Sequence, residues 1–145
     1  MKIMVLNGPN LNFLGIREKN IYGQENYQNV CEYIKDKFNG CNIEINIFQS
    51  NIEGEMINIL QRAYSEKYDG IVINPGAYTH TSIALYDAIK SINIPTVEIH
   101  LSNIHQREEF RHKSYTAPAC IGQICGFGKE GYIFAIEGLI AHLSK

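Results

Sequence analysis

Short apolar runs alternate with longer amphipathic stretches along the chain, and this pattern predicts an α/β protein. Five runs rich in β-branched residues have the length and composition of strands. They span residues 3–7, 43–49, 70–74, 96–101 and 119–124. Between and after them, apolar residues recur three and four positions apart, as they do on one face of a helix. The predicted helices span residues 26–38, 53–68, 79–92 and roughly 131–143.

This alternation predicts a mainly parallel sheet with helices on both faces, because parallel neighbours need crossover connections of about a dozen residues. Five strands in this pattern suit the flavodoxin-like strand order 2-1-3-4-5. In that order the chain changes direction between strands 1 and 3, and ligands bind beyond the carboxyl ends of the strands at that point. We therefore expect a single domain, residues 1–145, folded as a three-layer sandwich with its chemistry at that edge.

Composition and charge narrow the function classes. With 45% apolar and 19% charged residues the chain is of the ordinary globular kind, and its net charge of −2 gives no reason to expect nucleic acid or an acidic membrane as a partner. No run approaches the ~18 apolar residues of a membrane span, and no charged-then-apolar leader precedes the first strand. Because Cys31, Cys41, Cys120 and Cys125 form no C-x-x-C pair, we expect buried, reduced thiols in a cytoplasmic protein.

The segments that follow the first, third and fourth predicted strands are the richest in Asn, His and Arg. They read NGPNLNFLGIREKNIYG, NPGAYTHTS and HLSNIHQREEFRH. Three of the four arginines, Arg17, Arg107 and Arg111, lie in these segments. Because the carboxyl ends of parallel strands meet at one edge of a sheet, we expect the three segments to gather there.

Two polar side chains share one face of the fourth predicted strand. Strict alternation places Glu98 and His100 on the same side of the run TVEIHL. Burying a carboxylate and an imidazole costs several kcal/mol unless they pair. Glu98 could accept a hydrogen bond from one ring nitrogen of His100 and leave the other for proton transfer. A purely structural pair at a strand end is the alternative, and the position at the carboxyl end favours function.

Arg17 and Tyr22 lie five residues apart on a long, Gly-rich loop. Tyrosine is a poor base at neutral pH, but a cation held against its oxygen favours the phenolate. The pair could therefore act as a general base. An ordinary surface loop would carry the same two residues, and this alternative stays open at the level of spacing alone.

Arg107 and Arg111 are spaced so that, on a helix, they would share one face and could bind hydroxyls or a carboxylate. Ser102 or Asn103 could cap such a helix, whose free amides would offer an anion site. The alternative is a solvated surface on which the arginines pair with the neighbouring glutamates.

The segment GFGKEG, residues 126–131, matches the letters of the dinucleotide-binding pattern G-x-G-x-x-G. That site also needs another strand and an acidic residue about 20 positions later, and only 14 residues follow Gly131. We interpret the match as coincidence. His100 and His105 have the wrong spacing for a zinc-binding helix, and no metal site is expected.

Taken together, the loops resemble those of the type II 3-dehydroquinate dehydratases over essentially the whole chain. The resemblance is carried by NGPNLNFLG with REKNIYG, FQSNIEGEMI, INPGAYTHTSIALYDAI and VEIHLSNIHQREEFRHKS. It implies a flavodoxin-like enzyme of the shikimate pathway that eliminates water from 3-dehydroquinate, a small anionic substrate, to give 3-dehydroshikimate through an enolate. It also implies that no metal or organic cofactor takes part, and that the chain assembles as a homododecamer, a tetramer of trimers.

The resemblance implies a catalytic role for five residues. Tyr22 is similar to the base that takes a proton from C2, and Arg17 to the neighbour that lowers its pKa. His100, oriented by Glu98, is similar to the acid that protonates the departing C1 hydroxyl. Asn10 is similar to the residue that holds a water near the enolate oxygen.

Substrate-binding positions follow from the same resemblance. Asn74, with the backbone amides of Leu101 and Ser102, matches the carboxylate site of the family, and Gly76 belongs to the turn beneath the substrate.

The remaining positions implied by the resemblance bind or border the ring. His80 and Arg111 match groups that bind ring oxygens, and Arg107 is similar to an arginine that anchors the loop. Asp87 matches a residue contributed by a neighbouring subunit.

The chain departs from the family at two positions. Lys19 stands where the family often has a proline, so we expect a looser loop, and Ile52 stands where many members have a histidine, so we assign it no catalytic role. The competing interpretations are a flavodoxin-like domain that binds a nucleotide or flavin in the same crevice, and a phosphorylated receiver domain. The receiver needs an acidic cluster after the first strand, where Asn7 lies.

Overall fold

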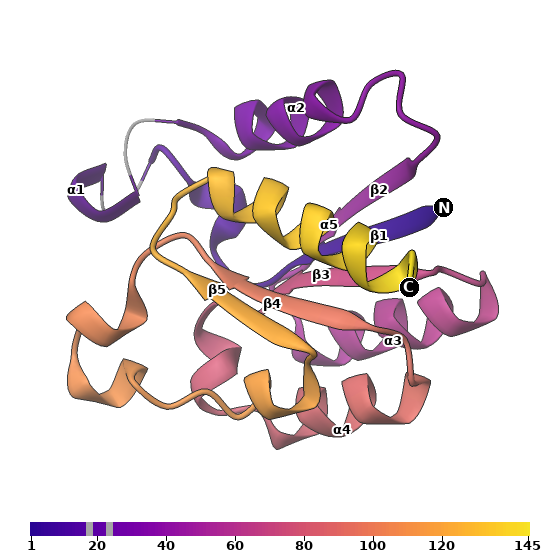
Figure 1. Cartoon of the computed structure of the whole chain (residues 1–145). Helices are drawn as coiled ribbons and strands as arrows, with labels where there is room; N and C mark the ends of the chain where they lie inside the picture. The colour runs from indigo at the N-terminus through magenta and orange to yellow at the C-terminus, as the bar shows by residue number, and fades with distance from the viewer. Residues whose placement is uncertain (17–18, 23–24) are drawn as a thin grey trace.

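A computed structural model describes residues 1–16, 19–22 and 25–145, with the backbone alone described at Lys19 and Tyr22. Five strands form one sheet (Figure 1). They are β1 (Lys2–Asn7), β2 (Glu44–Gln49), β3 (Gly70–Asn74), β4 (Thr96–His100) and β5 (Gly122–Cys125). All neighbours pair in parallel, in the order β2-β1-β3-β4-β5. The predicted fold class and strand order are confirmed.

Helices cover both faces of the sheet (Figure 1). These helices are α2 (Tyr27–Lys37), α3 (Glu53–Ser65), α4 (Ile83–Ile92) and α5 (Glu130–Leu143), and a short helix α1 (Lys19–Tyr22) lies beyond the edge of the sheet. Helices α2 and α5 pack on one face and α3 and α4 on the other. Alternate residues of β1 enter the two cores: Ile3 faces α2 and α5, and Met4 faces α3 and α4. Central strands buried on both faces read as continuous apolar runs, which explains why the sequence pattern located them so well.

The predicted helix at residues 79–92 begins later than expected. Residues 76–80 form a 3-10 turn, and α4 starts at Ile83 after Ser82, whose hydroxyl accepts a hydrogen bond from the Leu85 amide at 2.9 Å. A serine in this position satisfies one of the free amides of the first turn and so sets the start of the helix. Thr79 therefore belongs to the 3-10 turn and not to α4, and its side chain is completely buried.

The helix on which Arg107 and Arg111 would share one face does not form in the described structure. Two short 3-10 turns, residues 104–106 and 109–111, stand there instead, and Arg107 has an extended backbone between them. The side chain of Asn103 caps the first turn by accepting from the His105 amide at 3.1 Å. The final strand also begins later than predicted, because residues 117–119, which include Pro118, form another 3-10 turn before Gly122.

The loops after β1 and β3 touch at the carboxyl edge of the sheet, on the left in Figure 1. The Gly8 amide donates to the Asn74 carbonyl oxygen at 2.7 Å. A Cβ atom at residue 8 would lie 2.4 Å from the Pro75 carbonyl oxygen, so glycine is required for this approach. This contact holds the two loops close together at the carboxyl edge of the sheet.

The cysteine prediction is partly wrong. All four thiols are free, but Cys41 is exposed and Cys31, Cys120 and Cys125 are half-buried. Burial raises the pKa of the Cys125 thiol to about 11. In the part of the chain that the structure describes, no helix is both long enough and apolar enough to cross a membrane.

Candidate active site

A cavity of about 200 Å³ lies beyond the carboxyl ends of β1, β3 and β4. The three loops singled out in the sequence supply its walls. Nine of the predicted site residues line it: Asn10, Asn74, Gly76, His80, His100, Leu101, Ser102, Arg107 and Arg111. Sequence reasoning missed the apolar part of the lining, which includes Leu11, Leu14 and Ile104. These residues look like ordinary core positions in the sequence, and no signal separates them from the core.

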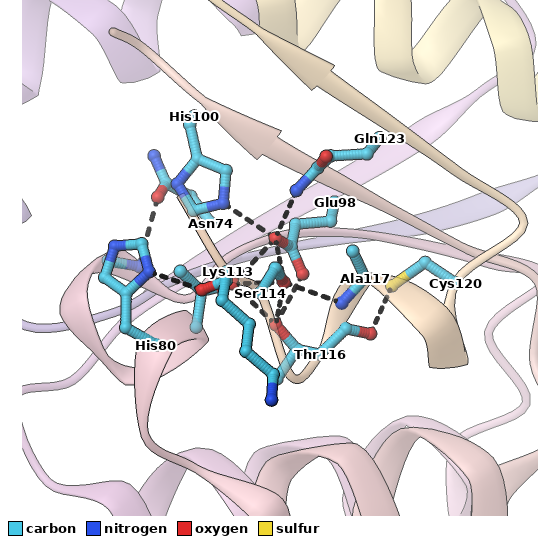
Figure 2. Close-up of polar contacts among 12 residues, drawn as sticks. Asn74, His80, Glu98, His100, Lys113, Ser114, Thr116, Ala117, Cys120 and Gln123 are labelled. Atoms are coloured by element: carbon cyan, nitrogen blue, oxygen red, sulfur yellow. Dashed lines mark hydrogen bonds and ion pairs between the residues drawn. The ribbon is translucent and has the colours of Figure 1, made fainter. Parts of the chain in front are cut away.

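Glu98 and His100 form the pair that strand alternation predicted. The Nε2 atom of His100 donates to Oε1 of Glu98 at 2.7 Å, and the carboxylate is completely buried (Figure 2). His100 is 6% exposed and reaches the cavity. Since Nε2 is engaged, Nδ1 is the ring nitrogen left for a ligand.

Four further side chains donate to the Glu98 carboxylate from the surrounding loops and β5; Ser114, Thr116 and Gln123 are labelled in Figure 2. Oε1 accepts from Thr79 Oγ1 at 2.8 Å, from Ser114 Oγ at 3.0 Å and from Gln123 Nε2 at 3.0 Å. Oε2 accepts from Thr116 Oγ1 at 2.5 Å. Burial tends to raise the pKa of Glu98, but the hydrogen bond and charge of His100, together with the hydroxyl donors, bring that pKa down to about 2. Glu98 is therefore a carboxylate at every physiological pH.

Sequence reasoning did not identify these donors. Thr79 and Ser114 lie within two of the stretches that carry the family resemblance but receive no role there, and Thr116 and Gln123 lie outside those stretches. The signal that could have found them is the carboxylate itself, because a buried charge needs several donors and the nearest loops must supply them.

His80 stands beside His100 on the cavity wall. Its Nδ1 atom donates to the Lys113 carbonyl oxygen at 2.8 Å, which fixes the tautomer and leaves Nε2 as an acceptor (Figure 2). The two rings are stacked at 6.4 Å between centroids. Burial lowers the pKa of His80 below its ordinary value, and the nearby His100 and Arg111 act in the same direction. At neutral pH His80 is a neutral group able to accept a hydrogen bond.

The amide of Asn74 is held at both ends. Its Oδ1 atom accepts from the Gly76 backbone amide at 3.2 Å, and its Nδ2 atom donates to the Tyr132 hydroxyl at 3.2 Å. Asn10 is held from outside the cavity, since its backbone amide donates to Asn51 Oδ1 at 3.0 Å. Asn10 also has a left-handed backbone with φ of 67°, which asparagine adopts more readily than most residues.

The sequence left two interpretations open for the two arginines, a ligand-binding role and a surface on which they pair with glutamates. The structure has a feature of each. Arg107 and Arg111 line the cavity, and Arg111 Nε also donates to Glu108 Oε2 at 2.5 Å in a surface ion pair. Two guanidinium groups give the cavity a positive wall that suits an anionic ligand.

Three predicted site residues are not among the described residues that line this cavity. Arg17 lies outside the described residues, and Tyr22 is described by its backbone alone, at the end of α1. Asp87 is exposed on α4 and does not line the cavity. Within the described ranges no group of three or more His, Cys, Asp or Glu side chains could hold a metal ion.

Comparison with known proteins gives consistent matches over the whole chain. The family model described as "Dehydroquinase class II" matches residues 1–140. The 3-dehydroquinate dehydratase of Clostridium perfringens strain 13 is 67% identical over 145 residues, covering all of this chain and 99% of that protein. The protein of the same name from Clostridium acetobutylicum is 68% identical and covers 100% of both chains.

Solved structures match over almost the whole chain as well. The type II dehydroquinase from Butyrivibrio crossotus superimposes with a TM-score of 0.95 at 57% identity, covering 97% of each chain. The type II dehydroquinase from Propionibacterium acnes gives a TM-score of 0.90 at 34% identity, covering 99% of this chain and 97% of that one.

Proposed function

Because the chain belongs to the class II dehydroquinase family, we propose that it eliminates water from 3-dehydroquinate to give 3-dehydroshikimate through an enolate intermediate. The observation that carries the proposal is the His100–Glu98 pair on the wall of a cavity that also holds Arg107 and Arg111. The proposal is supported by the position of His100 and the two arginines beyond the switch point of the sheet, where ligands of such folds bind and where His100 could donate a proton.

The first step is removal of the C2 proton. The neighbouring carbonyl makes this C–H bond acidic, and Tyr22 as phenolate takes the proton, with the Arg17 cation favouring the phenolate form. The electron pair of the C–H bond moves onto the carbonyl oxygen and gives an enolate. A water held by Asn10 stabilises that oxyanion by donating a hydrogen bond to it. The roles of Tyr22 and Arg17 rest on the family resemblance, since both side chains lie outside the described structure.

The second step is loss of the C1 hydroxyl. His100 donates the proton on Nδ1 to this hydroxyl, the C–O bond breaks, and the enolate electrons form the ring double bond as water departs. Glu98 holds the Nε2 side of the ring at 2.7 Å and so aims Nδ1 at the leaving group. The proton gained by Tyr22 returns to solvent as His100 takes one up, which restores both groups.

Substrate binding uses the remaining cavity residues. The carboxylate is bound by the Asn74 side chain with the amides of Leu101 and Ser102, and His80 and Arg111 bind the ring oxygens. The neutral state of His80 supports its role, because its Nε2 can accept a hydrogen bond from a substrate hydroxyl.

Assembly and location form part of the same proposal. We infer a cytoplasmic homododecamer, a tetramer of trimers, in which Asp87 reaches the cavity of a neighbouring subunit. The support is that Asp87 is exposed on α4 and does not line the cavity of its own chain. No metal or organic cofactor is required by the two steps above.

The test is an ultraviolet assay for the conjugated enone of the product. Purified protein mixed with 3-dehydroquinate should raise the absorbance, and no increase above buffer from folded protein would contradict the proposal. A flavin-binding protein of the same fold would instead quench added flavin.

Replacing the base tests the mechanism. Tyr22→Phe should lower kcat by at least about a hundredfold, because the phenol oxygen accepts the C2 proton, while binding of 3-dehydroshikimate stays measurable. Tyr64→Phe is the matched control, since Tyr64 is 68% exposed on α3. Near-normal turnover of the Tyr22 variant would show that another group is the base.

A further inference from the structure

A line of buried polar side chains runs from the cavity wall into the packing beneath α2 and α5. Its centre is Tyr132 on α5, which is 1% exposed. The Tyr132 hydroxyl lies 2.5 Å from Oδ1 of Asn7, at the end of β1, and 3.2 Å from Nδ2 of Asn74, at the end of β3. Asn7 in turn lies 3.3 Å, through Nδ2, from the hydroxyl of Tyr27 at the start of α2.

The direction of every hydrogen bond in this line is determined. The Gly76 backbone amide can only donate, so the atom it contacts at 3.2 Å must be the Asn74 oxygen, and Nδ2 therefore faces Tyr132. The single proton of the Tyr132 hydroxyl goes to Asn7 Oδ1, which leaves the phenol oxygen as acceptor for Asn74. Each link thus requires the next, as in a cooperative chain.

The consequence for the cavity concerns the second N–H of Asn74. One N–H is engaged by Tyr132, and Asn74 lines the cavity, so the other N–H is available to a ligand there. If the amide were turned over, its oxygen would replace that N–H and would repel a carboxylate. Burial raises the pKa of Tyr132, so that its hydroxyl keeps its proton and remains a donor to Asn7 at neutral pH.

We propose that Tyr132 is a positioning residue for substrate binding: its hydroxyl holds the Asn74 amide with an N–H toward the substrate carboxylate. The inference rests on the proposed function, since it takes Asn74 as part of the carboxylate site. It adds a residue of α5 that does not line the cavity and acts through Asn74.

The test is Tyr132→Phe, which removes the hydroxyl and keeps the ring. KM for 3-dehydroquinate should rise about tenfold, the cost of roughly one hydrogen bond to a charged group, while kcat stays within about threefold. The carboxylate does not react, so losing its contact weakens substrate and transition state equally and appears in KM. Tyr68→Phe is the matched control, because Tyr68 is also buried but lies before β3, at the opposite end of the sheet.

A binding measurement separates this role from a loss of packing. Tyr132→Phe should weaken binding of 3-dehydroshikimate about tenfold. Binding of the analogue in which the carboxylate of 3-dehydroshikimate is replaced by a primary amide should change by no more than about twofold, because the neutral amide can pair with either orientation of Asn74. An unchanged KM, a fall in kcat at unchanged KM, or equal weakening of both ligands would overturn the proposal.

Two provisions keep the result interpretable. Wild-type turnover is measured in the same assay, so a failure of the proposed function shows as an inactive wild type, whereas a failure of this inference leaves the wild type active and the Tyr132 variant normal. If Tyr132→Phe does not fold, Asn7→Leu is used instead, because it removes the acceptor for the tyrosine proton and should raise KM in the same direction. A normal KM in a folded Asn7 variant would equally overturn the inference.

Discussion

At the scale of single residues, the burial of Glu98 explains the composition of its surroundings. A carboxylate with no exposed surface must be surrounded by donors, and His100, Thr79, Ser114, Thr116 and Gln123 supply them. The donors come from two loops and two strands, so the carboxylate also ties these segments together. Its ionised state fixes the orientation of His100, which makes the general acid of the proposed reaction dependent on side chains that never touch the substrate.

The stability of the protein at acid pH should depend on this carboxylate. The pKa of Glu98 is lowered from 4.5 to about 2 in the folded protein, so its contribution is complete above about pH 4.5 and is lost as the pH falls toward 2. The shift corresponds to about 3 kcal/mol. The difference in unfolding free energy between wild type and Glu98→Gln should therefore be largest above pH 5 and shrink below pH 4, as measured by denaturant titration. A difference independent of pH would show that the charge of Glu98 makes no such contribution.

Residue-level reasoning from the sequence found one part of the site and missed another, for a physical reason. Glu98 and His100 were found because two costly polar groups on one face of a buried strand need an explanation. Thr79 and Thr116 were missed because a hydroxyl costs little to expose or to bury with a partner, so its position carries no signal. The position of Tyr132 carries no signal either, since in the sequence it looks like an ordinary aromatic residue of an apolar helix.

At the scale of elements, the accuracy of the sequence predictions followed the amount of burial. β3 was predicted with its observed bounds, because all five residues are buried and the run is uninterrupted. The helix considered for Arg107 and Arg111 does not form, because the segment lies at the surface. There the Asn103 cap and the hydrogen bond of 2.9 Å between the His112 ring and the Arg107 carbonyl oxygen hold the backbone in two short turns. Such local contacts leave no periodic pattern to detect.

Two glycines should respond in opposite ways to the same change. Gly8→Ala places a Cβ against the Pro75 carbonyl oxygen at 2.4 Å, so the β1 and β3 loops must separate, with a cost of about 1–3 kcal/mol in stability and a loss of activity. Gly138→Ala, on the open surface of α5 with no heavy atom within 4 Å of the added Cβ, should raise stability by about 0.5–1 kcal/mol. Thermal unfolding and the enone assay measure both effects. Equal effects of the two substitutions would contradict the close approach at Gly8.

At the scale of the whole molecule, the proposed assembly accounts for the role proposed for Asp87, an acid that is exposed on its own chain. The sequence suggests the assembly only through the family resemblance. In the hydrophobic pattern, an apolar position that faces a neighbouring subunit looks the same as a core position. In solution the proposed dodecamer should have a mass near 200 kDa, twelve times the 16.5 kDa chain, by light scattering.

Mixed oligomers test whether Asp87 acts across subunits. Asp87→Asn and Tyr22→Phe should each be nearly inactive alone, but co-expressed chains carrying the two changes should recover activity in up to about a quarter of the sites, where an intact Tyr22 meets an intact Asp87 from its neighbour. If Asp87 acted within its own chain, no site would hold both intact residues. A mixture as inactive as the two single variants would therefore contradict the proposal that Asp87 acts in the site of a neighbouring subunit.

The strand order also has a consequence for how the molecule is made. As the chain leaves the ribosome, β2 adds to one side of β1, β3 to the other, β4 to β3 and β5 to β4, so that no strand has to be inserted between two that have already paired. The sheet can therefore grow during synthesis by addition at a free edge, which spares the nascent chain from breaking earlier pairings. The last strand to arrive brings Gln123 to the Glu98 carboxylate. An unfinished chain can hold most of the fold, but the donor set of Glu98 is complete only when β5 pairs with β4.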